Sequence, residues 1–290
     1  DNLVAPDTAH TPANPGILGL ITGERRWLAA GVSQAAWHLG NQNPGRRAIQ
    51  PIWSFNARIL WWGMRDLFIG WLCAKELGWT DHITEYGRAL DLMASWMMIE
   101  KELPHLKHAG IIDADYGQDL PNWMTCAVTS PWQADMGVGV VAWMVKYGLR
   151  QYDPVLDHLL VGLRLRFQAY VWVEQTYGIP VGTNYRLPIS SSYIEGKSKT
   201  EVGSFVYPKN QSEVLDVFKA FLAATEKESW SWGTFNDWSA QTLCAAIMAR
   251  NAGKNVADIV DAYTASRAYY LGKNPGLKVY QQYAIVDEAA

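Results

Sequence analysis

The chain has 290 residues, of which 49% are hydrophobic and 18% charged, and its net charge at neutral pH is −3. This composition supplies a large core and is unlike that of a disordered chain, and the scattered basic residues exclude the clustered basic face of a nucleic-acid-binding protein. The most apolar stretch, residues 59–74, is interrupted by Arg65 and Asp66 and falls short of the roughly 20 apolar residues of a membrane span.

The chain begins Asp1-Asn2-Leu3, with neither an initiator Met nor the basic and apolar regions of a signal peptide. We therefore expect a processed product or a fragment of a larger protein. Its cysteines show no Cys-x-x-Cys spacing, so a zinc ribbon or a redox motif is not expected. The compartment is left open, with a secreted or periplasmic location preferred.

Helical hairpins organise the sequence. Each consists of an apolar helix, a glycine at the position where helices often end in the left-handed conformation, and an amphipathic helix. The predicted pairs, with their glycines, are 15–22 and 24–39 (Gly23), 53–77 and 81–100 (Gly78), 132–147 and a partner opening at Asp153 (Gly148), and 237–251 and 256–271 (Gly253). An unpaired amphipathic helix is predicted over 212–227, and alternating apolar residues predict a small β-hairpin within 190–208.

Alternation of fully buried and half-buried helices is what a double ring of helices produces, because its inner ring is covered on both sides. We therefore predict an all-α fold, an α/α toroid of helical hairpins in one domain over residues 1–290, with a small β-hairpin in a long loop. A superhelical bundle of another kind would give a similar pattern. Trp62 and Trp143 lie in the middle of apolar helices and are predicted to be buried in the core.

The connections between hairpins are long and the turns within them are short, so we expect the long loops to share one face, where function usually resides. Aromatic rings on that face would suit sugar rings, although the tryptophans could instead simply plug the toroid. The predicted substrate-binding residues are Trp123, Trp132, Tyr185, Trp230, Trp232 and Trp238, together with Arg58 and His10.

Isolated polar residues have structural alternatives. Arg58 and Arg65 lie seven residues apart on a buried helix, and we expect each to find its partner on another helix or in a ligand, since Asp66 is predicted to point elsewhere. For His10 the alternative is a position beside a helix cap. His38 is predicted to lie at the surface.

The most polar segment, residues 105–135, supplies the catalytic candidates Asp115, Asp135, Tyr116 and His108. Paired carboxylates can hydrolyse a glycosidic bond, whereas a His or Tyr base beside an Arg or Asn that neutralises a uronate would suit β-elimination. The alternative is a solvated loop with turn-forming Asp and Gly residues. Asp113, Asp115 and Asp119 could also hold calcium, although EF-hand spacing is absent, and no other cofactor is expected.

The hairpin rhythm, the Thr22-Gly23-Glu24 turn and the Ser130-Pro131-Trp132-Gln133-Ala134-Asp135 entry into a buried helix resemble the six-hairpin glycosidase and polysaccharide-lyase superfamily. The resemblance implies an α/α toroid and a glycan substrate, but it assigns no catalytic residue. Only about four hairpins are predicted here. The toroid would therefore be incomplete, with further segments or chains completing it, or the chain is a non-catalytic relative.

Together these patterns predict a carbohydrate-active enzyme that cleaves a polysaccharide or oligosaccharide, with glycoside hydrolase ahead of polysaccharide lyase. The alternative is a non-catalytic carbohydrate-binding or structural module of a larger secreted or virion-like assembly. The expected partner is a glycan, and neither a nucleic acid nor a membrane.

Overall fold

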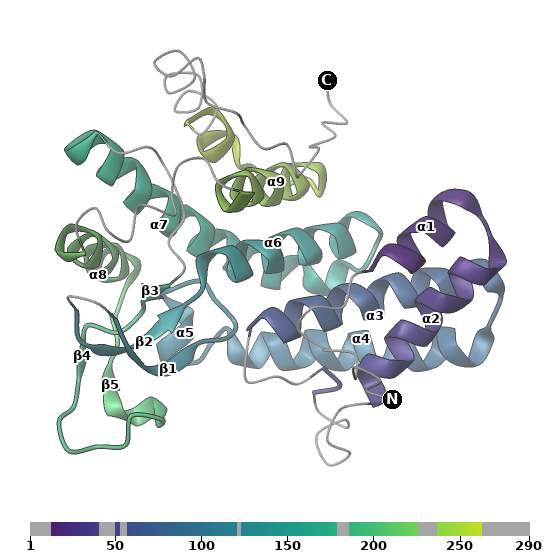
Figure 1. The fold of residues 1–290 in the computed structure, drawn as a ribbon, viewed down its shortest axis with the longest axis horizontal. Helices are drawn as coiled ribbons and strands as arrows, with labels where there is room; N and C mark the ends of the chain where they lie inside the picture. Colours follow the sequence, from purple (N-terminus) through teal and green to yellow (C-terminus); the bar gives the residue numbers. More distant parts are fainter. Residues whose placement is uncertain are drawn as a thin grey trace, which may run out of the picture. The chain divides into compact units, whose positions relative to one another are not determined.

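A computed structural model describes residues 13–40, 50–52, 57–120, 123–178, 186–225 and 237–262, and these are mainly helical, with small antiparallel sheets (Figure 1). The chain divides into two compact units, Asp1–Ile99 and Glu100–Ala290. No helix within the described ranges is long and apolar enough to cross a membrane. The mainly helical prediction is confirmed, but no ring of helices is seen among the described residues.

The first unit contains the two hairpins predicted for it. Its described helices are α1 (Asn14–Thr22), α2 (Arg25–Gly40), α3 (Ala57–Leu77) and α4 (Thr80–Glu100), whose last residue belongs to the second unit. Gly23 and Gly78 have φ angles of 70° and 69°, the left-handed conformation that favours glycine at a helix end. The helix ends predicted at these glycines are thus confirmed, while residues 53–56, where the second hairpin was predicted to begin, lie outside the described residues.

Small residues let α1, α2 and α3 approach closely. A Cβ atom added to Gly31 would lie 2.7 Å from the Cα of Gly16, and one added to Gly70 would lie 2.3 Å from the Cβ of Ala35. Cys73 belongs to the same contact, since its Sγ lies 3.6 Å from the carbonyl oxygen of Gly16. Burial raises the pKa of the Cys73 thiol to about 11, so this residue packs as a small unreactive hydrophobe.

A buried carboxylate on α3, that of Asp66, is bonded by side chains from α2 and α3. His38 Nε2 lies 2.8 Å from Oδ2, Gln34 donates to the same oxygen at 2.8 Å, and Arg65 donates to Oδ1 at 2.9 Å. His38 is fully buried, so its predicted surface position is wrong. The prediction that Asp66 points away from Arg65 is also wrong, because the long guanidinium side chain folds back onto the next residue.

The second unit combines helices with short strands. Its elements are α5 (Pro104–Lys107), β1 (Asp115–Asp119), β2 (Thr125–Thr129), α6 (Pro131–Lys146), η1 (Arg150–Tyr152), α7 (Asp153–Tyr177), β3 (Leu187–Pro188), β4 (Ser192–Tyr193), η2 (Val202–Ser204), β5 (Phe205–Val206), α8 (Gln211–Ala224) and α9 (Asp237–Asn251), followed by a helical segment at 257–262. Helix α6 packs against α7 and α9, and α7 packs against α8 (Figure 1). The two hairpins predicted here are confirmed over the described residues.

A three-stranded antiparallel sheet in the order β1-β2-β3 lies where long connections between hairpins were predicted, without strands. Asp115 pairs with Val128, and Val128 in turn pairs with Pro188. The strand signal was hidden because β1 reads Asp-Tyr-Gly-Gln-Asp, a sequence poor in strand-forming residues. The predicted β-hairpin is confirmed by β4 and β5, in which Tyr193 pairs with Phe205.

Two tryptophans predicted in the core are only half-buried. Trp62 lies beneath the Arg65 guanidinium, 5.0 Å from the ring centroid, and Trp143 stands edge-on to the exposed Tyr147. The buried indole of α3 is that of Trp61, which is 2% exposed. Neighbouring residues on a helix point about 100° apart, so a Trp-Trp pair cannot share one face.

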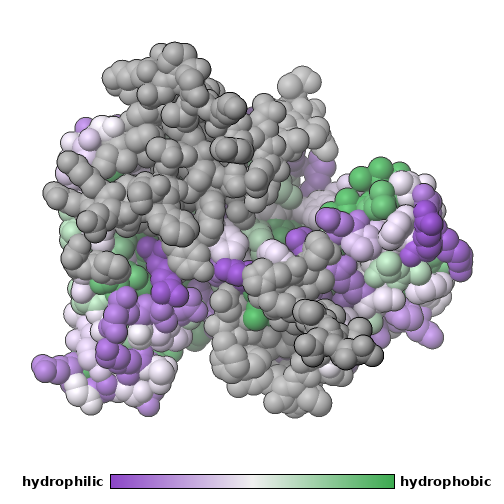
Figure 2. Space-filling model, viewed as in Figure 1, coloured by the Kyte–Doolittle hydropathy of each residue, from purple (hydrophilic) through white to green (hydrophobic). Residues whose placement is uncertain are grey.

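Hydropathy varies over the surface of each unit. In the first unit Leu18 and Ile21 of α1 are exposed, and Figure 2 shows a hydrophobic patch in the region of α1, next to hydrophilic surface. In the second unit the turn between β4 and η2, residues 195–201, is exposed and hydrophilic.

Candidate functional site

The backbone that leads from α5 to β1 is held against α7 by a close contact between glycines. A Cβ atom on Gly162 would lie 2.2 Å from the carbonyl oxygen of Gly110, so a larger residue would displace this segment. Gly110 itself has a φ of 64°. One turn before Gly162, His158 places its Nε2 2.8 Å from the carbonyl oxygen of Ile111. These contacts fix the position from which Asp113 projects.

Strand β1 carries a bulge next to the predicted residues Asp115 and Tyr116. Its pairing with β2 shifts between Asp115 and Gln118, where Gly117 has a φ of 67°. A Cβ atom on Gly117 would lie 2.5 Å from the carbonyl oxygen of Lys199, so the 195–201 turn packs directly on the bulge. A bulge bends its strand and re-aims nearby side chains, here those of Asp115 and Tyr116.

An aromatic cluster forms beside β1 from the rings of His105, Tyr116, Tyr193, Phe205 and Tyr207. Phe205 lies 6.3 Å from Tyr116, 5.7 Å from Tyr193 and 6.4 Å from Tyr207, measured between ring centroids. His105 lies 5.5 Å from Tyr207 and 6.2 Å from Tyr116. Phe205 is buried and the other rings are half-buried, so the cluster presents an aromatic surface to solvent.

An acid pair, Asp113 and Asp115, adjoins this cluster, and its members differ in electrostatic environment. Burial, aided by repulsion from Asp115 and Glu100, raises the pKa of Asp113 to about 7, even though its Oδ1 accepts a hydrogen bond from the Ala114 backbone N–H at 2.9 Å. Burial also raises the pKa of Asp115, but the positive charge of Arg186 opposes the shift. Asp113 is therefore partly protonated at neutral pH, while the charge of Arg186 favours the ionised form of Asp115.

Three rings of the cluster, those of His105, Tyr116 and Tyr207, are uncharged at neutral pH. Burial raises the pKa of Tyr116 and Tyr207, and neighbouring acidic groups raise that of Tyr116 further. Burial lowers the pKa of His105. Among the described residues, the charged side chains that act on the acid pair and Tyr116 are Glu100, Asp113, Asp115 and Arg186.

Of the predicted catalytic residues, the structure brings Asp115 and Tyr116 into this site. His108 is half-buried directly after α5. Asp135 lies in α6 and is 1% exposed, with its carboxylate accepting hydrogen bonds from Arg166 Nη2 at 2.7 Å and from the Thr242 hydroxyl. Asp135 thereby connects α6 with α7 through a buried ion pair and with α9 through a hydrogen bond. Its catalytic role stays a prediction.

The predicted substrate-binding residues are divided between the two units. Trp123 is half-buried and packs edge-on against Phe221 of α8, with 5.7 Å between ring centroids. Trp132 is half-buried in the first turn of α6, and Arg58 is half-buried in the first turn of α3. The described residues do not include His10, Tyr185, Trp230, Trp232 or the side chain of Trp238.

The proposed calcium ligands do not form a common site. Asp119, at the far end of β1, pairs with Lys199 at 3.3 Å and accepts a hydrogen bond from the Thr125 hydroxyl. Within the described ranges, no group of three or more His, Cys, Asp or Glu side chains is arranged to hold a metal ion.

The sequence interpretation did not assign Glu100, Arg186, Phe205 or Tyr207 to the site. The alternation that predicts the β4–β5 hairpin could have pointed to Phe205 and Tyr207. Glu100, the last residue of α4, and Arg186 carry no such signal, and the position of Arg186 follows from the pairing of β2 with β3, which the sequence does not reveal.

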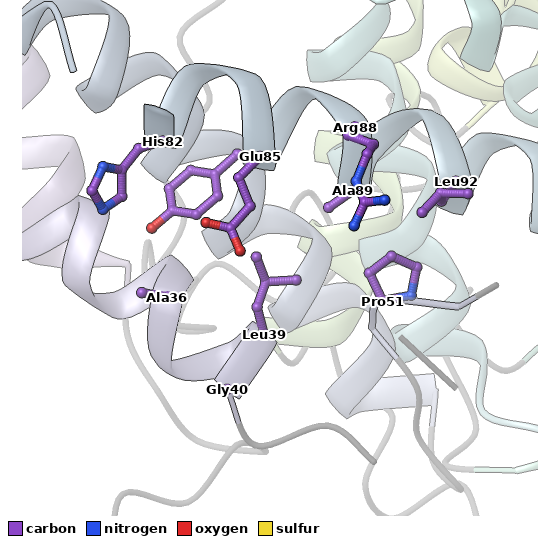
Figure 3. A pocket seen from close by; sticks show the side chains of 10 residues that line it. Ala36, Leu39, Gly40, Pro51, His82, Glu85, Arg88, Ala89 and Leu92 are labelled. Carbon is purple, nitrogen blue, oxygen red and sulfur yellow. The ribbon is translucent and has the colours of Figure 1, made fainter. Parts of the chain in front are cut away.

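A separate pocket of about 180 Å³ lies in the first unit (Figure 3). Glu85 and Arg88 extend from α4 towards Leu39 and Pro51, while the Tyr86 hydroxyl donates to the carbonyl oxygen of Val32 at 2.8 Å. None of the residues predicted to be functional lines this pocket. Its volume is below the roughly 300–1,000 Å³ of ordinary ligand sites, so it is a poor match for an oligosaccharide.

Comparison with known proteins gives no further guide, since no family model, curated protein or solved structure matches the chain.

Proposed function

We propose that the chain is a glycoside hydrolase whose site consists of the acid pair and the aromatic cluster of the second unit. The observation that carries this proposal is the acid pair itself. Asp113 and Asp115 lie two residues apart, yet one carboxyl is partly protonated at neutral pH and the positive charge of Arg186 favours the ionised form of the other. Glycosidases use two carboxyl groups in different environments, so that one acts as the general acid and the other as the base or nucleophile.

In the proposed reaction Asp113 acts as the general acid. It donates its proton to the glycosidic oxygen as the bond from that oxygen to the anomeric carbon breaks. Asp115 acts as an ionised carboxylate, which either accepts a proton from the attacking water or attacks the anomeric carbon itself. Water supplies the hydroxyl group of the new reducing end, and the acid pair ends the cycle in its initial protonation state.

The aromatic cluster suits the binding of a sugar chain. Its half-buried rings offer apolar faces for the C–H groups of sugars, and the hydroxyl groups of Tyr116, Tyr193 and Tyr207 can bond to sugar hydroxyls. The bulge at Gly117 and the contact between Gly110 and Gly162 hold the acid pair on rigid backbone beside these rings. A rigid support for the reacting groups is what catalysis needs.

A lyase mechanism fits the site less well. A tyrosine base must lose its proton, and burial raises the pKa of both Tyr116 and Tyr207. His105 remains able to act as a neutral base, since burial lowers its pKa. It does not explain the acid pair, however, and so hydrolysis is preferred.

We also propose that the helical hairpins belong to an α/α toroid, completed by segments outside the described residues or by other chains. This part of the proposal rests on the confirmed hairpins and on the resemblance to the six-hairpin superfamily.

The test is a screen of polysaccharides for new reducing ends, followed by substitutions in the acid pair. Asp113→Asn and Asp115→Asn should each lower turnover about a hundredfold or more. Asp119→Asn is the matched control, because Asp119 is an exposed aspartate on the same strand, paired with Lys199. The hydrolase proposal fails if both acid-pair variants keep full activity on a substrate that the wild-type chain cleaves.

The second candidate is a non-catalytic carbohydrate-binding module. It is favoured by the packing of Phe205, which is 5% exposed and contacts three tyrosines, as expected if the cluster mainly stabilises the β4–β5 hairpin. In that case glycans would bind without being cleaved, and Asp113→Asn would leave their affinity nearly unchanged.

A further inference from the structure

The pocket of the first unit lies between α2 and α4, beside Pro51 (Figure 3). The buried Tyr86 forms part of its wall, and the hydrogen bond from the Tyr86 hydroxyl to the Val32 carbonyl oxygen ties α4 to α2. The His82 ring stands edge-on to Tyr86, with 5.6 Å between ring centroids. The apolar side chains of the wall are those of Ala36, Leu39, Pro51, Ala89 and Leu92. The pocket therefore has a fixed wall with an apolar surface for part of a ligand.

An acidic and a basic side chain of α4, those of Glu85 and Arg88, share this pocket. They lie three residues apart, a spacing at which opposite charges commonly pair along a helix. Here neither side chain forms a hydrogen bond or an ion pair with any described residue, and both extend towards Leu39 and Pro51 (Figure 3). A carboxylate and a guanidinium are thus available to one ligand in the same pocket.

We propose that this pocket binds a free α-amino acid with an aliphatic side chain. The Glu85 carboxylate accepts hydrogen bonds from the ammonium group of the ligand, and the Arg88 guanidinium donates to its carboxylate. The aliphatic side chain packs against Leu39 and Leu92. The Cβ atoms of Glu85 and Arg88 are about 5–6 Å apart at this helical spacing, so their side chains can reach the two charged groups of one small molecule.

The volume of the pocket sets the size of the ligand. An apolar cavity of about 150 Å³ holds benzene, so a volume of about 180 Å³ suits an amino acid such as leucine, with about nine heavy atoms, and is too small for a disaccharide. A molecule with one charge leaves either Glu85 or Arg88 beside an apolar group, which costs hydration. The proposal is separate from the hydrolase proposal, because this pocket belongs to the first unit and the acid pair to the second.

The test is a titration of the full chain with three ligands, followed by ligand-observed nuclear magnetic resonance. Leucine carries both charges, leucine methyl ester lacks the carboxylate, and isocaproate lacks the ammonium group. Leucine should bind with a Kd of about 10 mM or tighter, as expected for a ligand of its size. Each analogue should bind about threefold or more weakly than leucine at low salt, because each loses one charged contact.

Variants connect each charge of the ligand to one residue. Glu85→Gln should weaken leucine about threefold or more and leave isocaproate unchanged, whereas Arg88→Gln should weaken leucine and leave the methyl ester unchanged. Ala36→Leu keeps both charges but fills the pocket from an exposed position on α2, so it should abolish binding. Asp81→Asn is the matched control, since Asp81 is an exposed acid on α4 that does not line the pocket.

The thermal unfolding of each variant serves as a folding control, because Glu85, Arg88 and Ala36 are all exposed and their replacement should leave the melting temperature nearly unchanged. No binding of leucine up to about 10 mM would overturn the proposal. Binding of either analogue as tightly as leucine would also overturn it. So would full affinity of Glu85→Gln, Arg88→Gln and Ala36→Leu for leucine, since the ligand would then bind elsewhere.

Discussion

The buried ion pair between Asp135 and Arg166 offers the sharpest test of the second unit. Both side chains are almost completely buried, at 1% and 2% exposure. Nε and Nη1 of Arg166 have no hydrogen-bond partner within the described residues, so the contact with Asp135 carries most of the compensation for burying the guanidinium. Replacing Asp135 by Leu would leave that cation uncompensated.

The expected cost follows from this burial. Removing one partner of a buried ion pair typically costs about 3–5 kcal/mol of stability. Asp135→Leu and Arg166→Met should therefore each lower the free energy of unfolding by that amount. For a unit of this size the melting temperature should fall by roughly 6–20 °C. The double variant replaces the pair by apolar side chains and should lie within about 1 kcal/mol of wild type, which corresponds to a coupling energy of several kcal/mol.

Urea unfolding of the full chain, followed by helical circular dichroism, measures all four members of this cycle. Asp258→Asn is the control. Asp258 forms a more exposed ion pair with Arg164, which lies on α7 as Arg166 does, so this variant should change the free energy of unfolding by less than about 1 kcal/mol. Single variants that cost less than about 1 kcal/mol, or costs that simply add in the double variant, would refute the reasoning. Asp135 would then be free to serve in catalysis, as its sequence position suggested.

Three further predictions concern packing and titration. Gly31→Ala should lower the free energy of unfolding by about 1–3 kcal/mol, because the added Cβ would lie 2.7 Å from the α1 backbone. Gly87→Ala should raise it by up to about 1 kcal/mol, because the nearest atom to its Cβ is 3.5 Å away. Equal effects of the two variants in urea unfolding would contradict the tight helix contact. Trp61→Ala should cost about 3–5 kcal/mol and Trp62→Ala clearly less, and the reverse order would mean that α3 is rotated. The folded state raises the pKa of Asp113 from 3.8 to about 7, so the stability that its protonated form contributes is lost as the pH rises through that range. Asp113→Asn should abolish this loss, and the variant should melt at a higher temperature than wild type above about pH 7. A difference in melting temperature between the two proteins that does not change with pH would argue against the raised pKa.

The helical framework was largely predictable from the sequence because its signals are local. Gly23 and Gly78 each follow an apolar helix, and the left-handed turn that they permit needs no information from elsewhere in the chain. The amphipathic pattern of α8 and the alternation around Tyr193 and Phe205 are local in the same sense. These elements were predicted within a few residues of their observed ends.

The candidate site was predicted only in part because it depends on contacts between distant residues. Asp115 and Tyr116 could be identified from a polar segment rich in ionisable groups. The sequence could not show that the charge of Arg186 would act on Asp115, nor that Asp135, only a few residues after β2, would form a buried ion pair with Arg166. Hydropathy alone likewise did not decide which indole of the Trp61-Trp62 pair faces the core.

The register of β2 also bears on the order in which the second unit folds. Helices α6 and α7 both lie between Val128 and Pro188 in the sequence. Pairing of these two residues therefore closes a long loop, at a substantial cost in chain entropy. The α6–α7 hairpin has only a short connection and can form first. We therefore expect the acid pair and the aromatic cluster to assemble late, and amide hydrogens of β1 and β3 to exchange through partial openings that leave the α6–α7 hairpin intact.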